Sequence, residues 1–427
     1  MKTLTFHLIS FALCTIPVSC QSAPSFESQY QVICQTLDQH FFDLSYPNID
    51  WPKIKNFYAG KIRDVDGQDE FCILVNEMLD RFNVSHLALL HPEMKDPLFQ
   101  LVSKEGWVGL HVQVVEGQMV VSKVSPNSPA EKASFKMGQI LLRVAGKTIS
   151  NFISESETFR RPPFHLRSDQ AMLNMRVQFY TYGEIGELLE IESKASNGIQ
   201  TQRLSRVKRP GKTQLHEGLP VSFLDFETKD LKGGITYIRF NYFAHELLDQ
   251  IHSAINNSNG ARMIIDLRGN FGGLLEVRKS LADRFGREPA LLWSQHGRRG
   301  RHDLYLEPPD NPFPGHLVIL VDSSSASAAE EFAGGLQALS LATVIGEQTQ
   351  GKVLVADFQE ISRGVTLMYP VAITELANGV TLEGGGVIPD IEIKPTLASL
   401  QSGRDCQLEK AVAFLLETQV PASHQAH

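Results

Sequence analysis

The sequence predicts a multidomain α/β protein, because three successive parts of the chain carry three different patterns of apolar residues. Residues 24–100 show helical spacing, residues 101–207 contain short strands separated by turns, and residues 213–398 alternate strands with helices. At 427 residues the chain is also longer than one hydrophobic core usually serves. We therefore expect an N-terminal helical domain, a β domain and an α/β domain, followed by a C-terminal helix and tail over residues 399–427.

Residues 1–22 have the features of a secretory signal peptide. Lys2 precedes an apolar stretch that ends at Val18 and is followed by small residues. The stretch is too short to serve as a permanent membrane anchor. Cys20 is a candidate for lipidation, although Pro17 stands where lipoprotein signals usually carry a branched aliphatic residue. We expect export across the inner membrane, to the periplasm or to a lipid-anchored position in the cell envelope.

The composition argues against a nucleic-acid partner and against a metal site. The formal charge is -8 and the pI is near 6.0, with no long run of Lys or Arg to contact phosphates. Beyond the leader, Cys34, Cys72 and Cys406 lack the spacing of metal ligands, so we expect neither a metal nor a cofactor. An oxidising compartment would permit a bridge between Cys34 and Cys72, and the sequence leaves this pairing and the oligomeric state open.

The helical region ends in an extended segment that carries a polar pair. Apolar residues recur every three or four positions from Phe71 to Phe82, which predicts a helix. The pattern becomes extended over residues 84–90, where Ser85 and His86 are adjacent. His86 is one of 14 histidines, so on its own a structural role is the better interpretation.

The β domain resembles a PDZ domain. Strands are expected at 108–114, 119–124 and 140–144, then a helix at 169–179 and two strands around the turn 196–198. The candidate carboxylate-binding loop consists of Gly106, Trp107, Val108, Gly109 and Leu110. Backbone N–H groups in such a loop receive a peptide's terminal carboxylate while the peptide adds a strand to the sheet. The alternative is a β domain that binds nothing. Residues 208–212 are expected to form a linker.

The α/β domain places a serine at a strand-to-helix junction. Strands are expected at 235–240, 263–267, 317–321 and 342–346, with helices at 245–256 and from about 328 to 339. Ser327 precedes the second helix, and a serine there most often serves as its cap. As a nucleophile it would have the unpaired N–H of Ala328 nearby to stabilise an oxyanion. The turn containing Gly272 and Gly273, after the neighbouring strand, would bring a second N–H.

Four motifs of the α/β domain occur in a characteristic order. They lie at residues 266–273, 325–330, 346–352 and 383–390. With the preceding PDZ-like region, this order resembles the C-terminal processing and tricorn-core serine peptidases over most of residues 60–395. The resemblance implies a crotonase-like (ClpP/crotonase) α/β fold, an acyl-enzyme mechanism without cofactor, and Ser327 as nucleophile.

This family activates its serine in two ways, and the chain has candidates for both. In one branch a lysine is the base, and Lys352 matches it, but that branch carries a glutamine where this chain has Ala356. In the tricorn-like branch a Ser-His pair and a glutamate serve the site, and Ser85, His86 and Glu383 match them. Imidazole, with a pKa near 6.5, suits proton transfer at neutral pH better than a lysine near 10.4. We predict His86 as general base and then acid, with Glu383 as its polar partner, and leave Lys352 open.

The resemblance implies an endopeptidase that admits loosely folded chains and recognises their C-termini or apolar tails. We expect the helical and PDZ-like parts to move relative to the catalytic domain, so that His86 approaches Ser327 from another domain. The rival hypothesis is a non-catalytic peptide- or ligand-binding protein that keeps the peptidase architecture. Ala356 favours that rival, whereas the joint presence of Ser327, His86 and Glu383 favours the enzyme.

Overall fold

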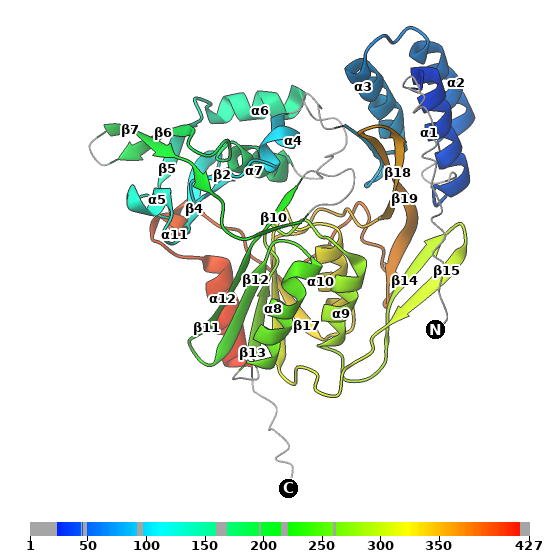
Figure 1. Cartoon of the computed structure of the whole chain (residues 1–427). Coiled ribbons are helices and arrows are strands. Elements are labelled where there is room, and N and C mark those ends of the chain that lie inside the picture. The colour runs from blue at the N-terminus through cyan, green and yellow to red at the C-terminus, as the bar shows by residue number, and fades with distance from the viewer. Residues whose placement is uncertain are drawn as a thin grey trace, which may run out of the picture.

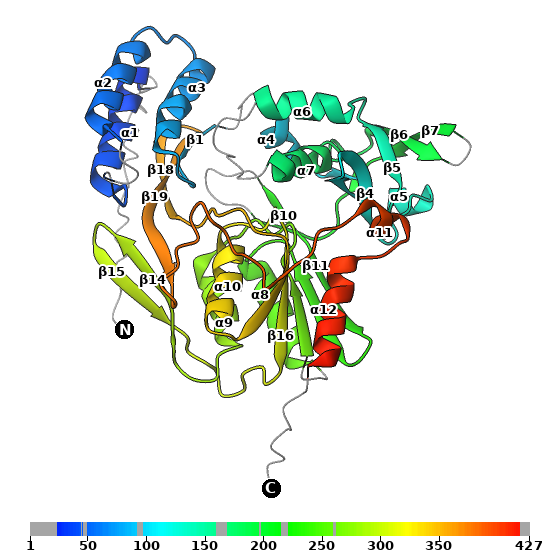
Figure 2. The same cartoon turned by 180° about the vertical axis from the view of Figure 1, so that it is seen from behind.

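The computed structural model describes residues 24–43, 45, 49–91, 97–158, 169–195, 198–214, 221–258 and 262–418. The leader and Cys20, on which the expectations of export and lipidation rest, lie outside these residues. Among the described helices, none is long and apolar enough to cross a membrane. Figures 1 and 2 show a mixed α/β protein with two lobes above a central sheet, one made by the N-terminal helices and one by the β module.

The first lobe contains α1 (Phe26–His40), α2 (Trp51–Ile62), α3 (Gln68–Leu79) and a 3-10 helix (Asp80–Phe82). Its core is shared with the catalytic part of the chain. The helices share their buried cluster with Leu354, Val365, Leu367 and Tyr369, from a distant part of the chain. Strand β1 (Ala88–Leu90) pairs antiparallel with β19 (Val365–Leu376), so the lobe is joined to the catalytic part by a sheet as well as by a core.

The strands that receive this lobe form a five-stranded sheet that the sequence patterns did not predict. Its main path runs β1-β19-β14-β15, with β18 also paired to β19. The further strands are β14 (Leu291–Gly297), β15 (Gly300–Tyr305) and β18 (Val355–Ser362). Cys34 and Cys72, for which a bridge was left open, are both buried and both free, and Cys406 is also free.

The second lobe is a β module with a sheet in the order β3-β4-β5-β6-β7. Its strands are β3 (Leu110–Val115), β4 (Gln118–Val124), β5 (Ile140–Val144), β6 (Leu188–Ala195) and β7 (Gly198–Ser205). The helices are α4 (Pro97–Val102), α5 (Pro129–Lys132), α6 (Ile149–Thr158) and α7 (Asp169–Phe179). Strand β3 lies at the edge of this sheet, with α7 beside it.

The segment expected as a linker, residues 208–212, begins in one small sheet and ends in another, with residues 209–211 between them. Strand β8 (Val207–Lys208) pairs with β2 (Gly106–Trp107), and β9 (Lys212–Gln214) pairs with β10 (Ser222–Leu224). These pairings give the backbone of the segment hydrogen-bond partners on both sides, so it connects the module to the central sheet through ordered strands.

The central sheet has the order β11-β12-β13-β16-β17-β20, and all its pairs are parallel except β11 with β12. Its strands are β11 (Phe226–Leu231), β12 (Ile235–Phe240), β13 (Arg262–Asp266), β16 (His316–Val321), β17 (Ala342–Gly346) and β20 (Ile391–Glu392). Helices α8 (His245–Asn256), α9 (Leu275–Asp283) and α10 (Ala328–Ala338) cover one face, and α12 (Cys406–Glu417) covers the other.

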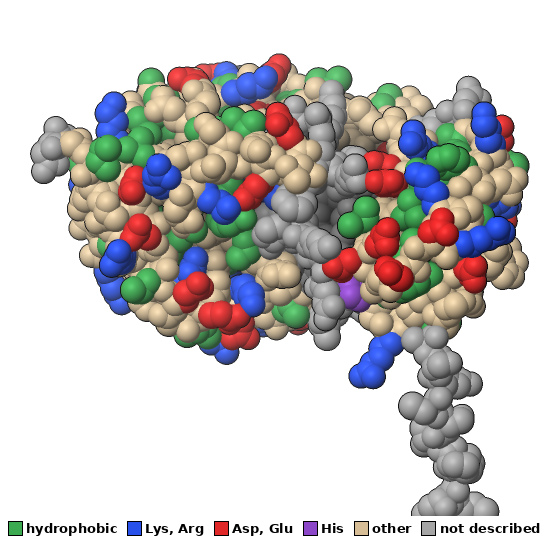
Figure 3. Space-filling model, turned by 90° about the horizontal axis from the view of Figure 1, so that it is seen from above, with side chains coloured by type: hydrophobic (Ala, Val, Ile, Leu, Met, Phe, Trp, Pro, Cys, Tyr) green, Lys and Arg blue, Asp and Glu red, His purple; other side chains and the backbone are tan. Residues whose placement is uncertain are grey.

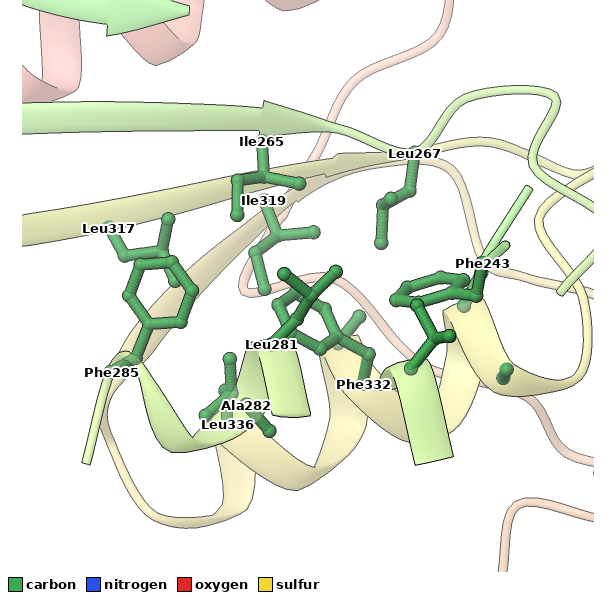
Figure 4. Close-up of a cluster of buried hydrophobic side chains, with 14 of the residues drawn as sticks. Phe243, Ile265, Leu267, Leu281, Ala282, Phe285, Leu317, Ile319, Phe332 and Leu336 are labelled. Atoms are coloured by element: carbon green, nitrogen blue, oxygen red, sulfur yellow. The ribbon is translucent and has the colours of Figure 1, made fainter. Parts of the chain in front are cut away.

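Successive residues of the central strands alternate between the two cores, as the strand geometry requires. Ile265 and Ile319 lie in the cluster under α8 to α10, whereas Ile264 lies in the cluster under α12. Figure 4 shows Phe332 of α10 and Leu281 of α9 packed below Ile265 and Ile319. Burial on both faces fixes the strand ends, from which the loops of the site emerge.

The C-terminal segment links the central sheet to the β module. After β20, helix α11 (Leu397–Gln401) packs against the module, where Leu400 joins a small buried cluster with Val115 and Val120. The backbone N–H of Leu397 also donates to Glu116 Oε1 at 3.2 Å. The module is therefore held to the catalytic part at its outer side as well as through β2 and β8.

Candidate active site

A cavity of about 1260 Å³ lies between the two lobes and the central sheet. Ser327, His86 and Lys352 all line it, so the structure brings the three principal candidates to one space. Ala356, near the start of β18 (Val355–Ser362), also lines this cavity. Seen from above, both lobes carry Lys or Arg side chains as well as Asp or Glu side chains (Figure 3).

Ser327 stands on a strained turn between β16 and α10. Its φ of 56° and ψ of -124° lie in a region that non-glycine residues rarely adopt, a cost usually found at functional sites. The same kind of tight strand-to-helix turn exposes the nucleophile in hydrolases of other folds. Gly272 packs against this turn, and a Cβ at Gly272 would lie only 2.7 Å from Ser327 Cβ. The backbone near Ser327 therefore requires glycine at position 272.

Glu330 connects this turn by hydrogen bonds to the loop that carries Lys352. Its carboxylate accepts hydrogen bonds from the backbone N–H groups of Ser327 at 3.0 Å and Lys352 at 2.8 Å. It also accepts from Thr349 Oγ1 and the Gly351 N–H, both at 2.5 Å. Burial raises the pKa of Glu330 to about 7. The sequence reasoning did not assign Glu330 a role, although an acid three residues after a capping serine is the signature of a capping box.

Ser85, His86 and Glu383 form one hydrogen-bonded chain. Ser85 Oγ donates to Glu383 Oε2 at 2.9 Å and lies 2.8 Å from His86 Nδ1. The Ser85 N–H donates to Glu383 Oε1 at 2.8 Å, and the Val353 N–H donates to Oε2 at 3.0 Å. Because the single hydroxyl proton of Ser85 is directed to Glu383, Nδ1 of His86 must be the donor to Ser85. His86 Nε2 is then the basic nitrogen.

Two half-buried groups compete as possible bases, and their surroundings shift the pKa of each toward the neutral form. Burial, reinforced by the positive charge of Lys352, lowers the pKa of His86 to about 4. Burial lowers the pKa of Lys352 to about 8, against the opposing charges of Glu383 and Glu330. At neutral pH the imidazole is consequently uncharged and able to accept a proton, while the lysine is mostly protonated.

Donors for an oxyanion lie beside Ser327. Ala328 is the first residue of α10, where a backbone N–H has no partner within the helix. Gly272 is less suited than the sequence suggested, because its N–H already donates to Asn270 Oδ1 at 2.8 Å. Gly273 and Phe243 form a parallel bridge, in which Phe243 is hydrogen-bonded to Gly272 and Leu274 on either side of Gly273. The N–H of Gly273 itself is therefore directed away from Phe243. The N–H groups of Ala328 and Gly273 are therefore the candidate oxyanion donors.

In the described part of the chain, no hydrogen bond joins the side chain of Ser327 to that of His86 or Lys352. Catalytic hydrogen bonds often form only when substrate is bound. No group of three His, Cys, Asp or Glu side chains suited to a metal ion occurs among the described residues. The chemistry available from this arrangement is that of a serine hydroxyl, a neutral imidazole bonded to the Ser85 hydroxyl that itself donates to a carboxylate, and candidate backbone N–H donors.

The candidate carboxylate-binding loop lies at the module's side of the same cavity. Trp107 lines the cavity, and the Gly106 N–H donates to the carbonyl of Gly183 at 2.8 Å. The carbonyls of Val108 and Gly109 accept from the N–H groups of Ala130 and Ser125, at 2.9 Å each. Leu110 is buried at the start of β3. The loop is therefore held rigidly by its own module.

Two family models match the chain. Residues 234–393 match peptidase family S41, and residues 22–80 match the tricorn protease C1 domain. The chain is 24% identical over 444 residues to a carboxyl-terminal-processing protease of Synechocystis sp., covering 99% of this chain and 97% of that protein. It is 26% identical over 359 residues to the carboxy-terminal processing protease CtpA of Bacillus subtilis, covering 82% of this chain and 69% of that protein.

Solved structures share the fold. The photosystem II D1 C-terminal processing protease matches with a TM-score of 0.55 and 21% identity, covering 88% of this chain and 98% of that one. Mature CPAF complexed with lactacystin matches with a TM-score of 0.59 and 12% identity, covering 91% and 97%. Residues 234–393 are thus a domain of peptidase family S41, residues 22–80 match the tricorn protease C1 domain, and the chain is similar to carboxyl-terminal-processing proteases over most of its length.

Proposed function

We propose that this serine peptidase cleaves extended or loosely folded protein chains with Ser327 as nucleophile and His86 as general base and then acid. The observation that carries the proposal is the hydrogen-bonded chain from Glu383 through Ser85 to His86, on the wall of the cavity that Ser327 also lines. Lys352 has the role of an electrostatic neighbour in this proposal, because its charge lowers the pKa of His86.

In the first step, Ser327 Oγ attacks the carbonyl carbon of the scissile amide while its proton passes to His86 Nε2. The oxyanion of the tetrahedral intermediate receives hydrogen bonds from the N–H groups of Ala328 and Gly273. The positive charge that develops on the imidazole is stabilised through Ser85 by the carboxylate of Glu383. His86 then gives its proton to the leaving amine, and the acyl group stays on Ser327.

In the second step, a water molecule attacks the ester carbonyl and passes a proton to His86 Nε2. The intermediate collapses when the bond between the acyl carbon and Ser327 Oγ breaks. His86 returns its proton to that oxygen. The acid product leaves and the enzyme is restored. No metal or cofactor enters this sequence of steps.

We also propose that residues 101–207 form a PDZ-like module that binds peptide C-termini, and that the α/β part is crotonase-like. The edge position of β3, the adjacent helix α7 and the loop before β3 support the first of these. The parallel strands alternating with α8 to α10 support the second. The leader sequence supports a location in the cell envelope, with lipidation of Cys20 as the candidate tether.

The rival, a non-catalytic binding protein, is not favoured by the family assignment. The rival would gain if His86 lay far from Ser327 with no hinge to close the gap; that both residues line one cavity supports the enzyme.

A fluorophosphonate reagent tests the proposal, because it forms a covalent bond only with an activated serine. We expect mass spectrometry to locate the adduct on Ser327, and labelling to be much slower in His86→Ala. Ser324→Ala is the matched control, since Ser324 lines the same cavity but precedes the strained turn, and it should be labelled like the parent. An adduct on another serine, or labelling that His86→Ala leaves unchanged, would contradict the proposal.

A further inference from the structure

The free edge of β3 is already hydrogen-bonded by side chains of α7. Because alternate residues of an edge strand direct their N–H and C=O groups outward, Leu110, Val112 and Val114 present the groups that would pair with an added strand. Gln178 Oε1 accepts from the Val112 N–H at 2.9 Å, and its Nε2 donates to the Leu110 carbonyl at 3.1 Å. One amide thus bonds two positions, as a peptide backbone would.

The next turns of the helix continue the same pattern. Asn174 Oδ1 accepts from the Val114 N–H at 2.7 Å, and Gln170 Nε2 donates to the Val114 carbonyl. Gln170 Nε2 also donates to Asn174 Oδ1 at 3.2 Å, which connects the two amides. Residues spaced four apart lie on one stripe of a helix, so the three amides form a row parallel to β3. We call Gln170, Asn174 and Gln178 the amide ladder.

We propose that the amide ladder is an internal substitute for a peptide strand, which an extended peptide with a free C-terminal carboxylate must displace to bind beside β3. The inference rests on the proposed peptide-binding function of the module. Strand addition uses the same backbone groups that the ladder occupies, so ladder and peptide exclude each other. The ladder therefore sets the affinity threshold for entry of a substrate terminus.

The position of the ladder connects it with catalysis. Asn174, Gln178 and Val112 line the cavity that also contains Ser327 and His86. A peptide that replaces the ladder would remain in the space that holds the nucleophile. Weak binders would leave the groove closed, and only a terminus that makes good contacts elsewhere in the module would open it.

Fluorescence anisotropy with a labelled peptide of apolar C-terminus tests the competition. The full chain carrying Ser327→Ala serves as the parent, so that the probe is not cleaved, and Asn174→Ala with Gln178→Ala removes most of the ladder. We expect the dissociation constant to fall about tenfold, since three competing hydrogen bonds are lost. The same peptide with an amidated terminus should bind more weakly to both chains, because its contact with the carboxylate-binding loop is lost.

Gln200→Ala is the matched control, because Gln200 is an exposed amide on β7 of the same module and outside the ladder. An unchanged or weaker affinity in the double variant, or an equal gain in Gln200→Ala, would overturn the inference. Hydrogen exchange provides a second measurement that does not need a ligand. The Val112 and Val114 amides should be protected in the parent and lose protection in the double variant, whereas fast exchange in the parent would refute the ladder.

Failure of this inference and failure of the proposed function are distinguishable. If the natural Ser327 chain cleaves casein but the ladder variants bind peptide no better than the parent, the ladder proposal fails and the peptidase proposal stands. If the variants bind peptide more tightly but the natural chain forms no adduct at Ser327, the peptidase proposal fails and the ladder proposal stands.

Discussion

The identity of the general base predicts the pH dependence of the reaction. The pKa of His86 is lowered to about 4 and that of Lys352 to about 8. At pH 6, His86 with its pKa of about 4 is about 99% neutral. Lys352 with its pKa of about 8 is only about 1% neutral at the same pH. With His86 as base, kcat/KM should therefore be nearly constant from pH 8 to pH 6, and with Lys352 as base it should fall about fiftyfold.

The assay is hydrolysis of a fluorogenic peptide between pH 4 and pH 9 at constant ionic strength. We expect a level profile that declines only on the acid side, well below the usual imidazole range. In Lys352→Met the acid limb should move to higher pH, because the removed charge is one cause of the lowered pKa of His86. Lys232→Met, at an exposed turn, is the control that should leave the profile in place. A tenfold rise per pH unit up to pH 8 would assign the base to Lys352 and refute the reasoning.

Three further substitutions test the remaining parts of the site. Gly272→Ala should reduce kcat at least a hundredfold, because its Cβ would lie 2.7 Å from Ser327 Cβ, whereas Gly269→Ala, at a similarly positive φ but with nothing within 4 Å, should keep activity. Ser85→Ala should lower kcat about a hundredfold with little change in KM, since the link between imidazole and carboxylate is lost but no substrate contact is. Unchanged kcat would remove Ser85 from the mechanism. Glu330→Gln should cost about 1–3 kcal/mol of stability, measured by denaturant unfolding, because either orientation of the amide turns its NH₂ toward two donors.

Regular elements with strong periodicity were predictable from the sequence. The helices expected at 169–179 and 245–256, and the strands expected at 235–240, 140–144 and 342–346, occur with those bounds. In the helix at 245–256, for example, the buried residues Leu247, Ile251 and Ile255 recur every four positions, so local and tertiary preferences agree.

The sheet that contains β14, β15, β18 and β19 was not predictable in the same way. Four consecutive residues of β18 are exposed, which removes the alternation that identifies a strand. Its partners also lie far apart in sequence, as in the pairing of Leu89 with Leu367. Because no local pattern encodes such a pairing, the chain's first lobe was expected to be separate and mobile.

The candidate site was predictable as a set of residues but not as a geometry. Ser85 and Glu383 are 298 positions apart, and only the family resemblance suggested that they meet. Polar side chains whose role is to bond the backbone could not be recognised from the sequence pattern. Glu330 resembles an ordinary helix-capping acid, and Gln170, Asn174 and Gln178 resemble the solvent face of an amphipathic helix.

The most direct test of the central claim is hydrolysis of casein by the parent chain beside Ser327→Ala, His86→Ala and Lys352→Ala. The account predicts that the first two variants are inactive and that the third retains hydrolysis, because the lysine only adjusts the electrostatics of the base. Loss of hydrolysis in Ser327→Ala and Lys352→Ala, with His86→Ala still active, would contradict the account and establish a lysine as the base.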